Sequence, residues 1–299
     1  MDLSRTEAVL VELGAGSRSA LREVIWRTGI RRIVQMNEIP SPKSEEFLNA
    51  DVIVIGADGP GPESLSLIRQ IRQSASTANP FAFVFATHFE PTREAISGAL
   101  EAGVDMILGK PLSTAVLHQR MGVHLAAPRK WMVSSSYIGP ERPAGPGSGT
   151  GTRLAAPHLL QMKAAGARVE DIRAAVESTK AQVVQQRKLH LAYQTAFVVA
   201  RAEVAPTDPA ALAELKQLRP MIRELLPQIE DPDRRFGAQV AADELLARLS
   251  HLWSGEANAM SYGPAVALAA QVFCLAVGRG QVHRAVTEIR AAAKMLHGR

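Results

Sequence analysis

The hydrophobic pattern of the first 126 residues predicts alternating strands and helices. Short, continuous apolar runs bounded by turn residues are typical of strands buried on both faces of a parallel sheet. The clearest run covers residues 52–55 and is followed by Gly56 and a loop rich in Gly, Pro and Asp. Strands are predicted at residues 7–13, 33–34, 52–55, 81–86 and 105–108, and helices at residues 17–28, 44–48, 63–74, 92–102 and 113–124.

This alternation predicts an α/β domain with a doubly wound, five-stranded parallel sheet and helices on both faces. Ligands of such sheets bind beyond the carboxyl ends of the strands. A site in residues 1–126 is therefore expected beside Gly56. In the helix predicted at residues 63–74, Ile68 and Ile71 share the apolar face, and the periodicity assigns Arg72 to another face.

The pattern changes between residues 127 and 157. Residues 130–138 are compatible with an extended arm, and residues 139–151 contain three Pro and five Gly. A segment of this composition lacks the apolar side chains that a packed core needs. We therefore expect an arm followed by a flexible linker.

From residue 158 to residue 299 the pattern is that of an all-α domain. Residues 169–204 follow steps of three and four, which predicts one helix roughly 50 Å long with the seam of a coiled coil. The later helices include residues 233–253, 262–277 and 281–297, of which residues 262–277 are apolar on most faces and are expected at the centre. Candidate residues of a homodimer seam are Val176, Val183, His190, Tyr193 and Phe197.

The composition agrees with a globular protein and excludes several kinds of site. Of the 299 residues, 46% are hydrophobic and 21% are charged. Because Cys274 is the only cysteine, an internal disulfide and a cysteine-based zinc site are excluded, and a reducing, cytoplasmic location fits. Its apolar neighbours predict a buried, inert thiol. The N-terminus lacks the pattern of a signal peptide, and the apolar run at residues 265–278 is too short for a membrane span.

Charge and motifs point away from an enzyme. The net charge of +5 is spread along the chain, so nucleic-acid binding is an alternative rather than the favoured function. The eight histidines show no metal-ligand spacing. Because no phosphate-binding loop and no catalytic motif is recognisable in the sequence, we expect no metal, no cofactor and no enzymatic activity.

Two stretches resemble the receiver domain of bacterial two-component response regulators. Residues 99–111 (ALEAGVDMILGKP) are similar to the family's fifth strand with the residues before it and the Lys-Pro after it. Residues 51–72 resemble its third strand, Pro-Gly loop and third helix. The resemblance covers about two fifths of the chain and implies a CheY-like fold. Residues 137–142 (YIGPER) also resemble a short segment that follows some bacterial receivers.

The resemblance implies a phosphorylation site made of a nucleophilic aspartate, two acids that hold magnesium, a hydroxyl residue and a lysine. By position, the nucleophile falls on Gly56, the acid pair on Glu12 and Leu13, the hydroxyl on Thr87, the lysine on Lys110 and the switch aromatic on Ile107. Counting back from the lysine would place His88 at the hydroxyl position. Glycine cannot form an acyl phosphate, and one remaining acid is a poor site for a hard cation. We therefore expect a degenerate pseudo-receiver without a metal.

Two residues of this pocket leave alternatives open. Asp58 could accept phosphate in a shifted loop, but we favour a turn residue that bonds to its own loop, because in-line transfer tolerates little misplacement. Lys110 is either a solvated lysine or the partner of Glu12 in an ion pair across the strand ends.

Three hypotheses for the function follow. The favoured one is a non-enzymatic signalling protein in which a pseudo-receiver binds a protein partner and the helical domain forms a homodimer. The second is an atypical response regulator whose helical domain binds DNA or RNA. The third, a phosphotransfer module acting through His190, has less support, because the acid or Lys-Gly typical after such a histidine is absent.

Overall fold

The computed structural model describes residues 2–58, 63–73, 78–90, 92–127, 129–142, 151–253 and 259–297. The chain forms two compact units, Met1–Val184 and Gln185–Arg299. Each unit has its own hydrophobic core.

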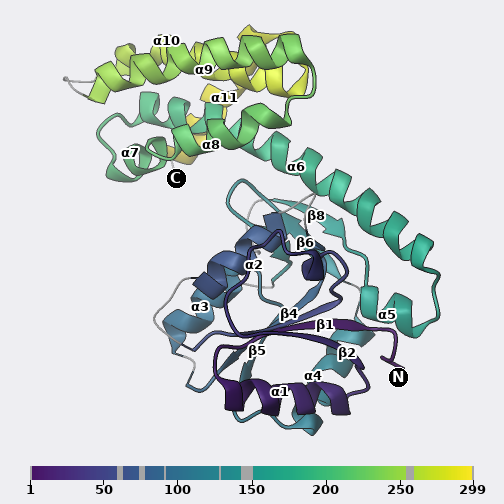
Figure 1. The fold of residues 1–299 in the computed structure, drawn as a ribbon. Helices are drawn as coiled ribbons and strands as arrows, with labels where there is room; N and C mark the ends of the chain where they lie inside the picture. The colour runs from purple at the N-terminus through teal and green to yellow at the C-terminus, as the bar shows by residue number, and fades with distance from the viewer. Residues whose placement is uncertain are drawn as a thin grey trace. The chain divides into compact units, whose positions relative to one another are not determined.

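The first unit is built on the predicted five-stranded parallel sheet (Figure 1). The strand order is β2-β1-β3-β4-β5, and each neighbouring pair is parallel. The strands are β1 (Glu7–Val11), β2 (Arg32–Met36), β3 (Val52–Gly56), β4 (Phe83–His88) and β5 (Met106–Gly109). The predicted fold class is confirmed: this is the order of a doubly wound sheet, in which the chain reverses direction beside β1.

Alternate residues of each strand supply two separate cores, one on each face of the sheet. In β3, Val52 and Val54 belong to one core, whereas Ile53 and Ile55 belong to the other. Helices α1 (Ala15–Arg27) and α4 (Thr114–Ala126) cover the first face, and α2 (Glu63–Gln73) and α3 (Arg93–Ala102) cover the second (Figure 1). The helix predicted at residues 44–48 is reduced to a short 3-10 turn, η1 (Glu45–Phe47).

The segment expected to be an arm and a flexible linker contains a second sheet. Its strands are β6 (Lys130–Val133), β7 (Ile138–Pro140) and β8 (Thr152–Ala155), which pair antiparallel in the order β7-β6-β8. Trp131 is fully buried and packs edge-on against Phe81. The expected arm at residues 130–138 is thus part of a sheet, and the flexible linker predicted at residues 139–151 is wrong where β7 continues to Pro140. Residues 143–150 lie outside the described part of the chain.

The second sheet is stable because helices later in the chain cover it. Leu159 of α5 (Leu159–Ala164) and Ile172 and Val176 of α6 (Val169–Val204) share a core with Trp131. Helix α6 has the predicted bounds, and its first half belongs to the first compact unit. The helical domain expected from residue 158 onward thus differs from the observed compact unit, which begins at Gln185.

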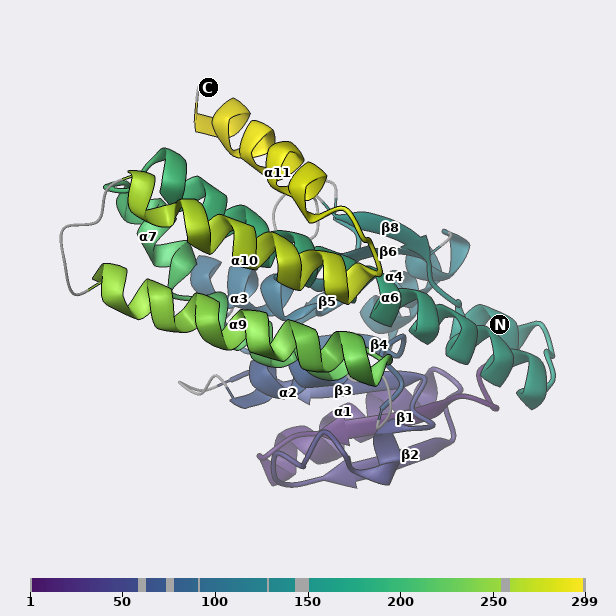
Figure 2. The ribbon, with the colours of Figure 1, turned by 90° about the horizontal axis from the view of Figure 1, so that it is seen from above.

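The second unit is entirely helical in its described residues. After the second half of α6 it contains α7 (Pro209–Leu215), α8 (Leu218–Leu225), the 3-10 turn η2 (Leu226–Gln228), α9 (Pro232–Trp253), α10 (Ala259–Val277) and α11 (Val282–His297). Helices α9 and α10 run side by side, and α11 also packs on α10 (Figure 2). Ala265, Val266, Ala269 and Ala270 of α10 are all fully buried, which confirms the predicted central helix.

No described helix is by itself long and apolar enough to cross a membrane. The segments Tyr262–Val277 and Val282–His297 meet the criteria of length and composition only as a pair, and that pair is bent by 113°.

Candidate functional site

The residues expected to form the receiver pocket lie at the carboxyl ends of the parallel strands. Gly56 is the last residue of β3 and pairs with Thr87 of β4. Glu12 directly follows β1, and Lys110 directly follows β5. Because parallel strands end at one edge of the sheet, these positions converge although they are far apart in the sequence.

Glu12 occupies the space next to Gly56 that a side chain at this position would need. A β-carbon added to Gly56 would lie 2.6 Å from Glu12 Oε2 and 3.0 Å from Glu12 Cδ. The backbone N–H of Gly14 donates a 3.2 Å hydrogen bond to Glu12 Oε1. The carboxylate is thus held over a glycine that offers no nucleophile.

Lys110 pairs with two carboxylates. Its Nζ lies 2.6 Å from Glu12 Oε2 and also forms an ion pair with Asp58 Oδ2. The Lys110 side chain is only 4% exposed, so these contacts are shielded from water. The ring of Phe89 adds a cation–π contact, with Nζ 4.9 Å from its centroid. The predicted ion pair between Glu12 and Lys110 is confirmed, and the solvated-lysine alternative is wrong.

Asp58 connects the end of β3 to the segment that follows β4. Its Oδ1 accepts a 2.6 Å hydrogen bond from the backbone N–H of Phe89 and lies 3.4 Å from His88 Nδ1. The expected bond within its own loop concerns residues 59–62, which lie outside the described residues, so that expectation stays a prediction. The partners of Asp58 lie about 30 residues further along the chain, where local turn statistics give no signal.

The other three residues assigned to the pocket have different environments. Thr87 is fully buried, and its hydroxyl donates a 3.4 Å hydrogen bond to the Ile55 carbonyl. Leu13 is 59% exposed, and Ile107 packs at the edge of the core under α2 and α3. The structure therefore brings together Glu12, Asp58 and Lys110 beside Gly56, but engages neither Leu13 nor Ile107 with them.

Glu12, Asp58 and Lys110 form one ion-pair cluster. A hard divalent cation requires several carboxylate or carbonyl oxygens. Glu12 and Asp58 both pair with the Lys110 ammonium, which therefore holds the carboxylates that such a cation would need. Across the residues with described placement, no group of three or more His, Cys, Asp or Glu side chains could hold a metal ion. The magnesium chemistry of the receiver family does not fit these residues.

A second charged cluster, which sequence reasoning missed, lies at the opposite edge of the sheet. Asp105, just before β5, accepts hydrogen bonds from Arg72 Nη2 at 2.7 Å, Arg129 Nη2 at 2.7 Å and the Val84 N–H at 2.8 Å. Arg72 is 1% exposed. The helical periodicity assigned Arg72 to another face than Ile68 and Ile71 but gave no sign that Arg72 is buried, because the groups that accept from it are not its neighbours along the helix.

Backbone carbonyl groups also accept hydrogen bonds from this cluster. Arg72 Nε donates to Gly103 O at 2.9 Å, and Arg72 Nη1 donates to Ala82 O at 2.8 Å. Burial lowers the pKa of Arg72 to about 10. Burial acts to raise the pKa of Asp105, but the charges of Arg129 and Arg72 outweigh it, so this pKa lies below its usual value. At neutral pH the cluster therefore holds two guanidinium cations and one carboxylate.

The segment Tyr137–Arg142 is part of this edge. The Tyr137 hydroxyl donates a 2.9 Å hydrogen bond to Pro140 O, and Arg142 donates to the carbonyls of Val104 and Asp105. A β-carbon on Gly139 would lie 3.2 Å from Gly103 Cα, so glycine allows a close approach of the two backbones. The segment that resembles a receiver tail is thus docked on the sheet.

The proposed dimer seam is divided between two environments. Val176 and Val183 are buried in the core around Trp131, so the chain itself covers them. Tyr193 is 40% exposed and stacks on Phe197 with ring centroids 5.8 Å apart. His190 is half-buried, and burial together with Arg187 lowers its pKa. A seam that uses all five residues at once would require Val176 and Val183 to leave their present core.

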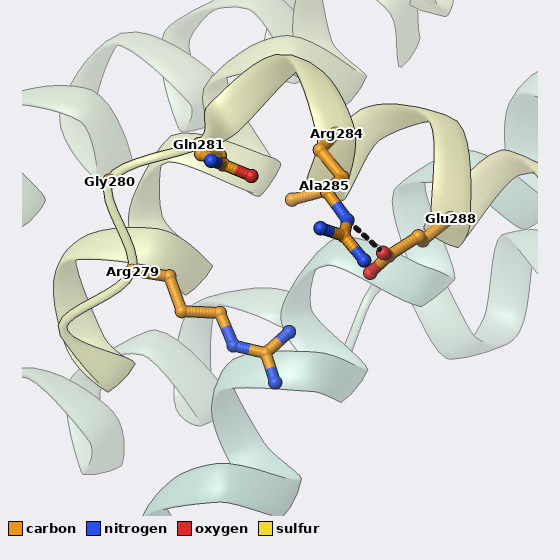
Figure 3. A pocket seen from close by; sticks show the side chains of 6 residues that line it. All are labelled: Arg279, Gly280, Gln281, Arg284, Ala285 and Glu288. Atoms are coloured by element: carbon orange, nitrogen blue, oxygen red, sulfur yellow. Dashed lines mark hydrogen bonds and ion pairs between the residues drawn. The ribbon is translucent and has the colours of Figure 1, made fainter.

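The second unit contains a cavity of about 570 Å³ at the turn between α10 and α11 (Figure 3). Arg279, Arg284 and Glu288 contribute its charged side chains. Arg284 Nε lies 2.9 Å from the Glu288 carboxylate, as the dashed line in Figure 3 indicates. Arg284 and Glu288 are exposed, with 74% and 50% of their side chains accessible. This cavity is an open, solvated depression.

Solved structures with a similar fold include receiver domains, and each covers 41% of this chain. A response regulator from Thermotoga maritima is 19% identical, with 99% of its chain covered and a TM-score of 0.33. The receiver domain of a sensor histidine kinase from Pseudomonas aeruginosa, solved with magnesium in its active-site cleft, is 20% identical, with 98% covered and a TM-score of 0.35. A protein from Burkholderia pseudomallei described as pilus assembly-related is 13% identical, with 91% covered and a TM-score of 0.36.

This likeness concerns the fold of the first unit. No model of a protein family matches the chain, and no curated protein matches it. The class of the first unit therefore rests on its own strand order: it is an α/β unit with a receiver-like fold.

Proposed function

We propose that the chain is a non-enzymatic signalling protein whose receiver-like unit acts without phosphorylation. The observation that carries this proposal is the contact between Glu12 and Gly56: the acceptor position has no nucleophile, and a carboxylate fills the adjacent space. The pairing of Lys110 with Glu12 and Asp58 supports the same conclusion. An incoming phosphoryl group would have to displace two carboxylates from the ammonium that should bind it.

Asp58 is the one alternative acceptor in this pocket. A nucleophilic carboxylate needs an open path for in-line attack and a metal to screen the phosphate charge. Asp58 instead accepts a backbone hydrogen bond from Phe89 and pairs with Lys110. In our proposal Asp58 therefore fixes the loop after β3.

The direct test is incubation of the full chain with acetyl phosphate and magnesium, followed by intact-mass measurement. We expect no increase in mass. A stable aspartyl phosphate that disappears in the Asp58→Asn variant would overturn the proposal and assign the acceptor to Asp58. An active receiver domain treated in parallel shows that the reagent is competent.

The function proposed for the helical unit is protein binding, including self-association. Phe236 and Val240, one helical turn apart on α9, are 72% and 52% exposed. Residues four apart lie on one face of a helix, so these two form a small apolar surface. Contiguous apolar surface marks contacts with another protein chain, and in our proposal these two residues are part of such a contact.

Light scattering after size-exclusion chromatography tests self-association of the full chain. We expect a dimer that dissociates in the Phe236→Gln/Val240→Gln variant and persists in Val123→Gln, which changes an equally exposed residue of α4. A monomeric wild type at all accessible concentrations would contradict self-association and leave a different protein as the partner to be sought by pull-down.

Nucleic-acid binding receives less support from the charged residues of α11. Arg284 pairs with Glu288, and Arg290 Nη2 lies 2.6 Å from Glu203 Oε1. Guanidinium groups neutralised in this way contribute little to a phosphate-binding surface. We expect no salt-dependent binding of the chain to labelled duplex DNA; a steep loss of affinity with added salt would instead favour the nucleic-acid hypothesis.

A further inference from the structure

A cavity of about 420 Å³ opens at the amino-terminal edge of the parallel sheet, away from the Glu12–Lys110 pocket. Asp105, Arg129, Lys130 and Arg142 contribute charged groups to its lining, together with His124. All of these residues belong to the first compact unit. The cavity is therefore a separate feature of the receiver-like unit.

Positive charge exceeds negative charge around this cavity. Asp105 already binds both Arg72 and Arg129, so one carboxylate is shared by two buried guanidinium groups. Glu141, the other acid of the lining, forms an ion pair with Arg153. Lys130 and Arg142 form no ion pair within the described part of the chain, and Arg142 is held through the carbonyls of Val104 and Asp105.

Excess charge of this kind is costly where water has little access. Only 8% of Arg129 and 1% of Arg72 is exposed. A compact anion in the cavity would supply the missing negative charge next to Lys130 and Arg142, which form no ion pair of their own among the described residues.

The uncharged part of the lining suits a small ligand. Phe83 and Pro140 provide apolar surface. The ring of His124 packs edge-on against Phe83, and burial lowers the pKa of this histidine, which keeps it neutral at pH 7 and able to donate a hydrogen bond. Binding sites of this size usually combine apolar walls with a few convergent polar groups.

We infer that this cavity binds a small molecule through a compact oxyanion group, either a phosphate or a carboxylate, held by Arg142, Lys130 and Arg129. The inference goes beyond the proposed function, because it does not depend on the state of the Glu12–Lys110 pocket. Such a ligand would contact the carbonyl-bound Arg142 and would therefore stabilise the docking of the segment Tyr137–Arg142 on the sheet.

Calorimetric titration of the full chain tests this site. Inorganic phosphate and succinate serve as the two probes, each compared with sodium chloride at equal ionic strength. We expect saturable binding of at least one probe. The probe that binds more tightly shows whether the oxyanion group of the ligand is a phosphate or a carboxylate. The Arg142→Gln variant should weaken binding at least about tenfold, and the Lys130→Gln variant at least about fivefold. These factors correspond to the loss of one charge-assisted hydrogen bond.

A control variant distinguishes binding in this cavity from binding in the cavity between α10 and α11. Arg284→Gln changes the depression between α10 and α11 and should leave binding unchanged. Lys130 is exposed, so Lys130→Gln keeps the test valid if Arg142→Gln fails to fold. The inference is overturned if neither probe binds saturably, or if binding survives Lys130→Gln and is lost in Arg284→Gln.

Discussion

Gly56 and the Glu12 carboxylate share a space that is too small for a β-carbon: the added atom would lie 2.6 Å from Glu12 Oε2. Glu12 is in turn held by Lys110, with 2.6 Å between Oε2 and Nζ. The glycine at the end of β3 is therefore a packing requirement of this pocket.

Substitution of Gly56 by alanine should destabilise the first unit by about 1 to 3 kcal/mol, the usual cost of overpacking. The physical reason is displacement of the Glu12 carboxylate from Lys110. Gly16, near the start of α1, has open space around the position of its β-carbon. Gly16→Ala should therefore be neutral or stabilising by up to about 1 kcal/mol, since alanine favours a helix. Urea unfolding of both variants measures the difference, and equal effects would contradict the close contact at Gly56.

Replacement of Lys110 by methionine should cost about 3 kcal/mol, because it leaves the two carboxylates of Glu12 and Asp58 without their shared cation in a shielded site. The Lys110→Met/Glu12→Gln double variant should recover part of this loss, since only one uncompensated charge then remains. A double-mutant cycle from urea unfolding gives the coupling energy. A Lys110→Met variant as stable as the wild type would show that the lysine is not engaged as described.

Asp105→Asn should destabilise the first unit by about 3 kcal/mol or more at neutral pH, because Arg72 and Arg129 remain buried without a counter-charge. The wild-type pKa of Asp105 is lowered by Arg129 and Arg72 against the effect of burial. A carboxylate with a lowered pKa in the folded state stabilises the protein at higher pH, and this contribution is lost as the pH falls below 3.8, the usual value for aspartate.

The pH dependence separates the charge effect from a packing defect. The free energy of unfolding of the wild type should fall in acid, whereas that of Asp105→Asn should fall less over the same range. Chemical denaturation at a series of pH values measures both curves. Parallel curves would indicate that Asp105 does not carry the acid sensitivity.

Val183 and Val184 provide a matched pair on α6. Val183 is 6% exposed and lies in the core with Trp131, whereas Val184 is 37% exposed. Val183→Ala should cost about 2 kcal/mol through lost burial and a residual cavity, and Val184→Ala should change stability by less than about 0.5 kcal/mol. If Val183→Ala instead changes the oligomeric state without lowering monomer stability, the expected dimer seam at this position is supported.

Much of the architecture could be predicted from local pattern. The apolar run before Gly56 and the helical periodicity of residues 169–204 were sufficient to place β3 and α6. These predictions succeed because strand and helix periodicity depend on neighbouring residues. The sequence also placed Glu12 and Lys110 at the same edge of the parallel sheet, but it left open whether they form an ion pair, which the structure shows.

The second sheet could not be predicted in this way. Trp131 lies in a stretch of mixed composition next to a Pro- and Gly-rich segment, so the local pattern resembles a linker. Its burial depends on Ile172 and Val176, which lie about 40 residues further along the chain. A strand becomes stable here only when a distant helix covers it.

The sequence by itself determined the order of strands and helices, the glycine at the end of β3 and the placement of Glu12 and Lys110 at the same edge of the sheet. Only the tertiary structure decided what those groups do: Asp58 pairs with Lys110, and Arg72 is drawn into the interior by carbonyl groups and Asp105. The physical reason is that periodicity reports whether a position faces a core, whereas charge pairing and hydrogen bonding depend on which distant residues the fold brings within about 3 Å.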